Sequence, residues 1–184
     1  MDIRIFISMS KRALKKYLTE LKKKDLEDQL LDLYGRFPVV KKYYDFIFNP
    51  KEDKLMQEAK GKISNEYFPL KRKRARARRS VAQKYIKHFI TLGVDPFLLA
   101  DLMLFNLETA QRYSRVSNVN DVFYKSMLNS FKEVIGHLSQ NALLADYRER
   151  TLKIYTFTQE NRWSFGEEFS RALDSVDLPL HDQQ

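Results

Sequence analysis

Apolar residues recur every three or four positions along most of this 184-residue chain, and few turn-forming residues interrupt them. The sequence holds only five Gly and five Pro, which favours long helices over a fold rich in tight turns. No segment sustains the alternating, β-branched-rich pattern that indicates a strand. These observations predict an all-α fold.

Capping and proline signals divide the chain into about eight or nine helices. Ser10 is a suitable N-cap, and both Asn49-Pro50 and Asp95-Pro96 place a cap residue before a proline that fits the first helical turn. The segment 97–115 is apolar almost all round, which predicts a central buried helix. The expected helices cover residues 11–23, 24–35, 38–48, 50–67, 80–92, 97–115, 122–139, 143–160 and 165–173.

The connections between these helices are short, which favours antiparallel packing of neighbours. We expect an irregular multi-helix bundle of about eight or nine antiparallel helices. The two proline-marked starts lie 46 residues apart, so a short helical-repeat-like array is the alternative. The expected organisation is a loose N-terminal extension over 1–9, a single helical domain over 10–175 with a basic arm at 70–80, and a disordered tail over 176–184.

Aromatic residues are dense at the end of the second expected helix and along the third. We interpret them as core, although Tyr43 and Tyr44 are adjacent and cannot both point inward. We therefore expect one of these two tyrosines at an interaction surface. The aromatic residues of this segment are Tyr34, Phe37, Tyr43, Tyr44, Phe46 and Phe48.

Composition excludes several classes of protein. There is no Cys, and therefore no disulfide framework, no thiolate nucleophile and no Cys-ligated metal site. No apolar run approaches the roughly 18–20 residues that a membrane span needs. These features predict a soluble, cytoplasmic protein without a transmembrane segment.

No catalytic or cofactor-binding motif is visible in the sequence. The three histidines, His88, His137 and His181, are isolated and belong to no metal-ligand pattern. Glu133 and His137 are spaced four residues apart, but this pair does not recur as a di-iron helical bundle would require. We expect no enzyme activity, no catalytic residue, no metal site and no cofactor.

The excess positive charge is concentrated in one segment. Residues 71–79 read KRKRARARR, and no acidic residue lies between Glu66 and Asp95. The nine Lys and Arg within that window equal the formal net charge of +9 for the whole chain. A localised basic block of this kind is typical of proteins that bind polyanions.

The basic run is expected to form an arm between two helices. Ser80 and Gln83 are spaced as in a capping box, which predicts that the following helix begins at Ser80. Extending that helix backward would put Arg78 and Arg79 on its apolar face, where unpartnered guanidinium groups are costly. In an extended arm, the alternating arginines would share one face about 6–7 Å apart. We expect the arm to be mobile when nothing is bound to it. The arginines that alternate are Arg72, Arg74, Arg76 and Arg78.

Three interpretations of the arm remain open. The favoured one is a nucleic-acid contact through phosphates, extended by Lys84 and Lys87 on the next helix and by stacking of Tyr67 or Phe68 on bases. Of these two roles, we expect core packing at the end of the preceding helix more than stacking for both aromatic residues. The second interpretation is a helical adaptor or structural protein that binds an acidic protein surface, with an anionic membrane surface as its weaker form. The third is a solvated linker without a ligand. The expected contact residues within the arm are Lys71, Arg72, Lys73, Arg74, Arg76, Arg78 and Arg79.

Several segments carry a resemblance to a known family. They read SKRALKKYLTELKKKDLEDQLLDLYGRF, VKKYYDFIFNP, ARRSVAQKYIKHFITLGVDP and FYKSMLNSF. The chain resembles a family of small uncharacterised all-helical bacterial proteins catalogued as a domain of unknown function. The resemblance extends from Met9 to about Asp146 and implies a helical cytoplasmic protein whose usual start is Met9. It implies no activity and supplies no site residues.

Overall fold

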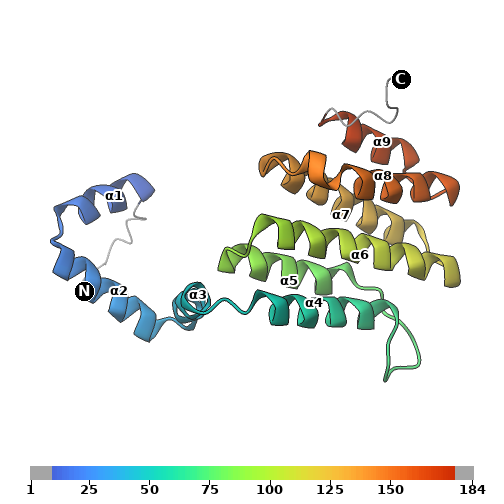
Figure 1. Ribbon diagram of the computed structural model, residues 1–184. Helices are drawn as coiled ribbons and strands as arrows, with labels where there is room; N and C mark the ends of the chain where they lie inside the picture. The colour runs from blue at the N-terminus through green and yellow to red at the C-terminus, as the bar shows by residue number, and fades with distance from the viewer. Residues whose placement is uncertain (1–9, 177–184) are drawn as a thin grey trace, which may run out of the picture. The chain divides into compact units, whose positions relative to one another are not determined.

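The computed structural model describes residues 10–176, which contain nine helices and no strand (Figure 1). The all-α prediction is therefore confirmed. The expected extension at 1–9 and nearly all of the expected tail at 176–184 lie outside the described residues. The chain divides into two compact units at Pro50 and Lys51, where the sequence led us to expect one domain over 10–175.

The first unit contains α1 (Lys11–Glu20), α2 (Lys23–Arg36) and α3 (Pro38–Phe48). Ser10 caps α1 as expected, because its Oγ accepts a hydrogen bond of 3.2 Å from the Ala13 N–H. The hydroxyl of Tyr34 donates to Asp45 Oδ1 (2.7 Å) and so joins α2 to α3. Aromatic rings of the two helices also pack together, with 6.5 Å between the ring centroids of Tyr34 and Tyr44.

No side chain in α1, α2 or α3 is buried. The expectation of a core around the aromatic residues at 34–48 is therefore wrong for this unit. Tyr43 and Phe48 are 37% and 83% exposed, and the adjacent Tyr44 is half-buried. The physical reason is size, because about 40 residues cannot enclose a hydrophobic core without help.

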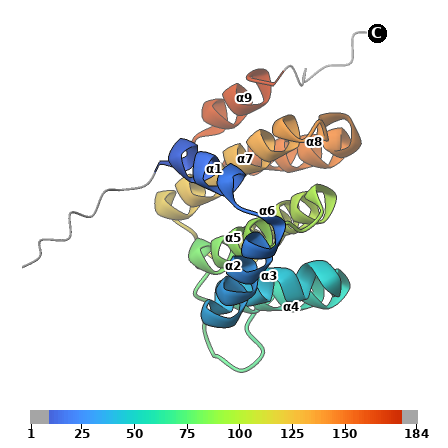
Figure 2. The same cartoon turned by 90° about the vertical axis from the view of Figure 1, so that its left-hand side faces the viewer.

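The second unit contains six helices, drawn in Figures 1 and 2 as a stack that runs from α4 to α9. Their bounds are α4 (Glu52–Tyr67), α5 (Arg79–Leu92), α6 (Pro96–Val116), α7 (Asp121–Gln140), α8 (Leu144–Glu160) and α9 (Gly166–Asp174). Each helix packs mainly on helices that are one or two positions away in the chain. The unit is thus a multi-helix bundle with mostly local packing.

The helix at α6 is central, as its apolar sequence predicts. It contacts α4, α5, α7 and α8, and contributes more buried residues than any other helix of the described part. Leu102, Leu104 and Leu107 on α6 are completely buried. The core continues through Phe131 on α7 to Phe169 on α9, whose rings lie 5.2 Å apart. This core fixes the end of α4 and the start of α5, and the basic arm connects the two.

The start of α5 differs from the sequence prediction. The helix begins at Arg79, and its N-cap is Arg78, which makes no side-chain capping hydrogen bond. The expected capping box of Ser80 and Gln83 is therefore wrong. Gln83 Nε2 instead donates to Glu133 Oε2 on α7 (2.6 Å), so a tertiary contact replaces the local cap.

No helix within residues 10–176 is long and apolar enough to cross a membrane.

Candidate nucleic-acid interface

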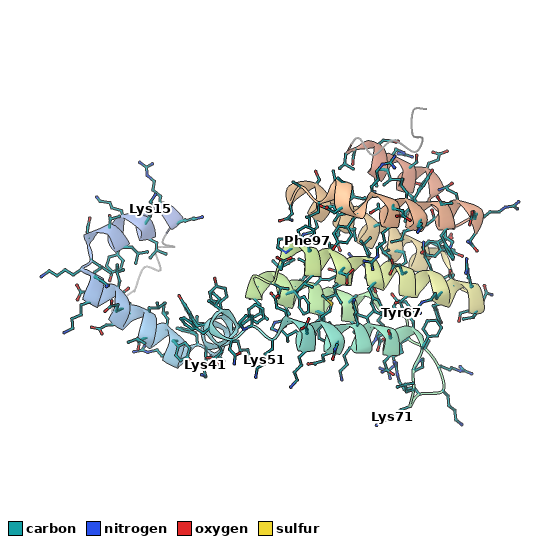
Figure 3. All side chains as sticks on the ribbon, in the orientation of Figure 1. Lys15, Lys41, Lys51, Tyr67, Lys71 and Phe97 are labelled. Atoms are coloured by element: carbon teal, nitrogen blue, oxygen red, sulfur yellow. The ribbon has the colours of Figure 1, made fainter. Side chains whose placement is uncertain are left out.

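The basic arm is the connection between α4 and α5, and it projects from one end of the second unit (Figure 3). Its tip carries Lys71, while Tyr67 at its root lies against the helices. This placement separates a charged tip from an anchored base. The interactions of the base decide which basic residues can reach a ligand.

Glu66, in the last turn of α4, holds both ends of the arm together. Its carboxylate accepts hydrogen bonds from Arg78 Nε (2.9 Å), Arg78 Nη2 (3.1 Å) and Arg72 Nη2 (3.2 Å). Its backbone carbonyl accepts from the N–H groups of Arg76 and Ala77, each at 3.0 Å. One residue therefore closes the loop through both its main chain and its side chain.

The Glu66 carboxylate is buried, with only 6% of the residue exposed. Hydrogen bonds from Arg78 lower the pKa of Glu66 below its usual value, against the raising effect of burial, and the charge of Arg72 adds to the lowering. The carboxylate is therefore ionised at neutral pH. A buried ionised carboxylate needs charged partners, and the two arginines of the arm supply them.

Arg79 anchors the end of the arm to α7. Its Nε donates to Ser130 Oγ (2.9 Å) and its Nη2 to Glu133 Oε1 (2.5 Å). The expectation that Arg79 lies outside the helix rests on the assumption that its guanidinium group has no partner. That assumption is wrong, because Ser130 and Glu133 provide partners from 51 and 54 residues away.

Four basic residues remain at the tip of the arm. They are exposed, and within residues 10–176 none of their side chains forms a hydrogen bond or an ion pair: Lys71, Lys73, Arg74 and Arg76. The expectation that the four alternating arginines share one face is therefore wrong. Arg72 and Arg78 turn to Glu66, whereas the side chains of Arg74 and Arg76 stay open to solvent.

The two aromatic residues at the root differ in accessibility. Tyr67 is 2% exposed, and its hydroxyl donates to Asn106 Oδ1 on α6 (3.2 Å). Burial raises the pKa of Tyr67 well above its usual value. Tyr67 is therefore a core residue, and its ring is not accessible for the alternative role of stacking on bases. Phe68 is 40% exposed and packs edge-on against Tyr113, with 6.1 Å between ring centroids.

Two hollows flank the arm and share Tyr113 as a wall. The first, of about 630 Å³, combines Phe68 and Val116 with Arg72, Lys73 and Arg74. The second, of about 600 Å³, is lined by Arg76, Arg78, Arg79, Asn118, Asn120 and Val122, among others. Each hollow therefore presents basic groups beside apolar or polar surface. Tyr113 was missed by sequence reasoning because it lies more than 30 residues from the arm and no local pattern marks it.

Lys84 and Lys87 are exposed on α5, as expected. A helix rises 1.5 Å per residue, so they lie roughly 7 and 12 Å along the axis from the first residue of α5. They can extend a basic surface beyond the arm, on the helix that follows it directly.

The other candidate for catalysis or metal binding, the pair Glu133 and His137, does not form a site. Glu133 faces Arg79 and Gln83, whereas His137 Nε2 lies 2.9 Å from the Pro96 carbonyl. In the described part of the chain, no cluster of three or more His, Asp or Glu could hold a metal ion. The basic arm is thus the most distinctive surface of the second unit.

The comparison with curated proteins found no match, and the comparison with solved structures found none. One family model does match, over residues 9–177, which extends beyond the region from Met9 to Asp146 that carries the resemblance in the sequence. The matched region contains α1 to α9 and the whole basic arm. The chain belongs to this family, which is described as a family of unknown function (DUF6155).

Proposed function

We propose that this chain is a non-enzymatic nucleic-acid-binding protein that contacts phosphates of DNA or RNA with the tip of its basic arm. The observation that carries the proposal is the division of the arm's charges. Arg72, Arg78 and Arg79 are held by Glu66 and Glu133, so their charges are used within the fold. The tip keeps four exposed cations whose side chains have no partner in the described part of the chain.

Such a tip suits a polyanion for electrostatic reasons. Each Lys or Arg that neutralises a phosphate releases condensed counterions, which gives a salt-dependent affinity with little sequence preference. The closed base supports this role, because a loop tied at Glu66 loses less conformational entropy on binding than a free chain would. The proposal assigns the protein to the cytoplasm, where it would meet nucleic acid.

The hollow beside Phe68 adds a place for an unpaired base. A half-exposed aromatic ring next to Lys73 and Arg74 offers a stacking surface beside groups that can hold the backbone. Stacking of this kind tolerates any base, in keeping with an interaction made largely through phosphates. Lys84 and Lys87 would extend the backbone path along α5.

The test measures binding of fluorescent single-stranded and duplex oligonucleotides across about 0.05–0.2 M salt. We expect the slope of log K against log salt to become shallower by about 0.7–0.9 for each phosphate that the tip variant no longer neutralises. Arg72, Arg78 and Arg79 stay unchanged so that the base of the arm is intact. The tip variant is Lys71→Ala, Lys73→Ala, Arg74→Ala and Arg76→Ala.

A matched variant removes the same charge from exposed lysines elsewhere on the second unit. It should keep most of the affinity and most of the salt slope if the tip binds the phosphates. If the two variants lose affinity and salt slope equally, net charge alone attracts the oligonucleotide, and the proposal is contradicted. The control substitutions are Lys51→Ala, Lys54→Ala, Lys125→Ala and Lys132→Ala.

The same titration separates the proposal from binding to an acidic protein. Polyglutamate serves as the probe for that alternative, because it carries negative charge without bases or phosphates. Binding of polyglutamate without binding of any oligonucleotide would overturn the nucleic-acid proposal and favour a helical adaptor for an acidic partner.

A further inference from the structure

The three helices of the first unit expose apolar side chains that the rest of this unit, within its described residues, does not bury. On α1, Leu14, Tyr17 and Leu18 are 43%, 43% and 37% exposed. On α2, Leu30 and Leu33 are 42% and 43% exposed. A soluble monomer rarely leaves so much apolar surface open on one short segment.

These residues form a stripe on each helix. Positions 14, 17 and 18 share one face of α1, and positions 26, 30 and 33 share one face of α2. The two helices diverge from the short turn between them, so that they form an open V in Figure 1. A hydrogen bond from Gln29 Nε2 to Tyr17 Oη (2.8 Å) links them, but their stripes do not bury each other. Each stripe is therefore free to pack on another helix.

One stretch of each helix carries charges of a single sign, and the two signs are opposite. Residues 11–16 of α1 contain four basic groups and no acidic one. Residues 25–32 of α2 contain four acidic groups and no basic one. The basic set is Lys11, Arg12, Lys15 and Lys16, and the acidic set is Asp25, Glu27, Asp28 and Asp32. With 3.6 residues per turn, Lys11 and Lys15 lie beside the α1 stripe, and Glu27 and Asp32 lie beside the α2 stripe. Glu27 and Asp32 form exposed ion pairs with Lys23 and Arg36 within α2, and exposed pairs of this kind are weak. A basic border on α1 and an acidic border on α2 are suited to pack together.

We propose that the first unit is a dimerisation module, in which α1 of one copy packs against α2 of a second copy of this chain. Both halves of the interface lie on the same segment. A two-fold arrangement therefore forms the α1–α2 contact twice and covers the apolar stripes of α1 and α2 in both copies. The apolar stripes supply the buried surface, and the opposite charges at their borders set the pairing. This inference is independent of nucleic-acid binding.

A second copy fits better than a purely basic or purely acidic partner. A basic partner would repel α1, and an acidic partner would repel residues 25–32 of α2. The module also holds too few residues to form its own core, which a second module would complete. The partner is therefore the chain itself.

The first experiment measures the mass of the full, nucleic-acid-free chain by light scattering after size exclusion over a concentration series. We expect a dimer, and we expect the double substitution Leu14→Asp and Leu18→Asp to raise its dissociation constant at least tenfold. Val116→Asp with Val122→Asp is the control, because these valines are 72% and 71% exposed on the second unit. The control chain should remain dimeric. A wild-type chain that is monomeric at every concentration overturns the proposal, as does a dimer that survives the leucine substitutions.

The second experiment tests the α1–α2 pairing with charge reversals. One chain carries Lys11→Glu and Lys15→Glu, and the other carries Glu27→Lys and Asp32→Lys, all beside the apolar stripes. Each variant alone should dissociate more easily than the wild type, because α1 and α2 then bear like charges. An equal mixture should recover a dimer that contains one copy of each chain, as read by native mass spectrometry with one chain tagged.

Two results would contradict this pairing. The first is a mixture no more associated than its separate components, and the second is a pair of variants that each dimerise as tightly as the wild type. Circular dichroism of every variant checks that helix content is retained, and Glu and Lys are both good helix formers.

Discussion

Arg78 donates a hydrogen bond to each oxygen of the Glu66 carboxylate, from Nε to Oε2 at 2.9 Å and from Nη2 to Oε1 at 3.1 Å. This bidentate contact joins the residue just before α5 to the last turn of α4. It closes the basic arm into a loop whose tip stays exposed. Bidentate pairing of Arg with a carboxylate fixes geometry as well as charge, so the shape of the arm depends on this pair.

Replacing Glu66 with Gln should destabilise the second unit. The substitution keeps the size of the side chain but removes the negative charge that accepts three hydrogen bonds from Arg72 and Arg78. We expect a decrease of about 1–3 kcal/mol in the free energy of unfolding, measured by urea denaturation. Glu160→Gln, at an exposed position on α8, is the control and should change stability by less than about 0.5 kcal/mol. Equal effects of the two changes would show that Glu66 does not hold the arm.

Arg76 and Arg78 should separate binding from stability. Arg78→Ala removes the grip on Glu66, so it should lower the urea midpoint. Arg76→Ala removes an exposed guanidinium group at the tip, so it should change stability by less than about 0.5 kcal/mol. It should also reduce the salt slope of oligonucleotide binding by about 0.7–0.9. Finding weaker binding in Arg78→Ala and lower stability in Arg76→Ala would reverse the assignment.

The contribution of Glu66 should disappear at acidic pH. The pKa of Glu66 in the folded protein lies below its ordinary value of 4.5, because Arg78 and Arg72 stabilise the charged form. The unfolded chain therefore takes up the proton first as the pH falls. The stabilisation is complete above the unfolded pKa and is lost as the pH falls through the folded pKa. The gap in thermal midpoint between wild type and Glu66→Gln should be widest at neutral pH and close in acid. A gap that stays constant across this range would exclude the ion pairs as its cause.

Most of the fold could be predicted from the sequence because its signals are local. The cap at Ser10, the proline start at Pro96 and the uniformly apolar segment around Leu104 each act within a few turns of helix. The base of the arm could not be predicted in this way. Glu66 marks the edge of the acid-free window in the sequence, but the chain reverses and brings it to Arg72 and Arg78. The partners of Tyr67 on α6 and of Arg79 on α7 lie still farther along the chain, and no local sequence pattern identifies them.

The same limit applies to the charge count. Seven basic residues in nine indicate a polyanion site, but the sequence cannot say which of them the fold itself uses. The structure assigns that role to Arg72, Arg78 and Arg79, and each pairs with a carboxylate outside the run. The expected set of ligand-binding residues in the arm is thereby narrowed to the four residues of the tip.

Arg150 should be a stability residue of the second unit. It extends from α8 and binds two carboxylates on α6, with Nε 2.5 Å from Glu108 Oε1 and Nη1 hydrogen-bonded to Asp101. Arg150→Leu would remove both hydrogen bonds that Glu108 accepts from Arg150 and would leave Asp101 its ion pair with Lys60, at 2.9 Å. We expect a decrease of about 1–3 kcal/mol in the free energy of unfolding by urea denaturation. Lys153→Leu removes an exposed pair with Glu149 within α8 and should leave the free energy of unfolding nearly unchanged. Comparable decreases from both substitutions would mean that helix charge, and not the α6–α8 pairing, is responsible.

Phe68 should contribute to binding of single strands without affecting its salt dependence. Its ring is 40% exposed beside Lys73 and Arg74, and it carries no charge that could release counterions. Phe68→Ala should therefore weaken single-strand binding by about 1–3 kcal/mol while the slope against salt stays the same. Duplex binding should change little, because paired bases are not free to stack on the ring. Ile90→Ala, at a residue 61% exposed on α5, is the matched control for removal of apolar surface. A reduced slope, or equal weakening for duplex and single strand, would mean that the substitution disturbs the arm and that Phe68 does not contact bases.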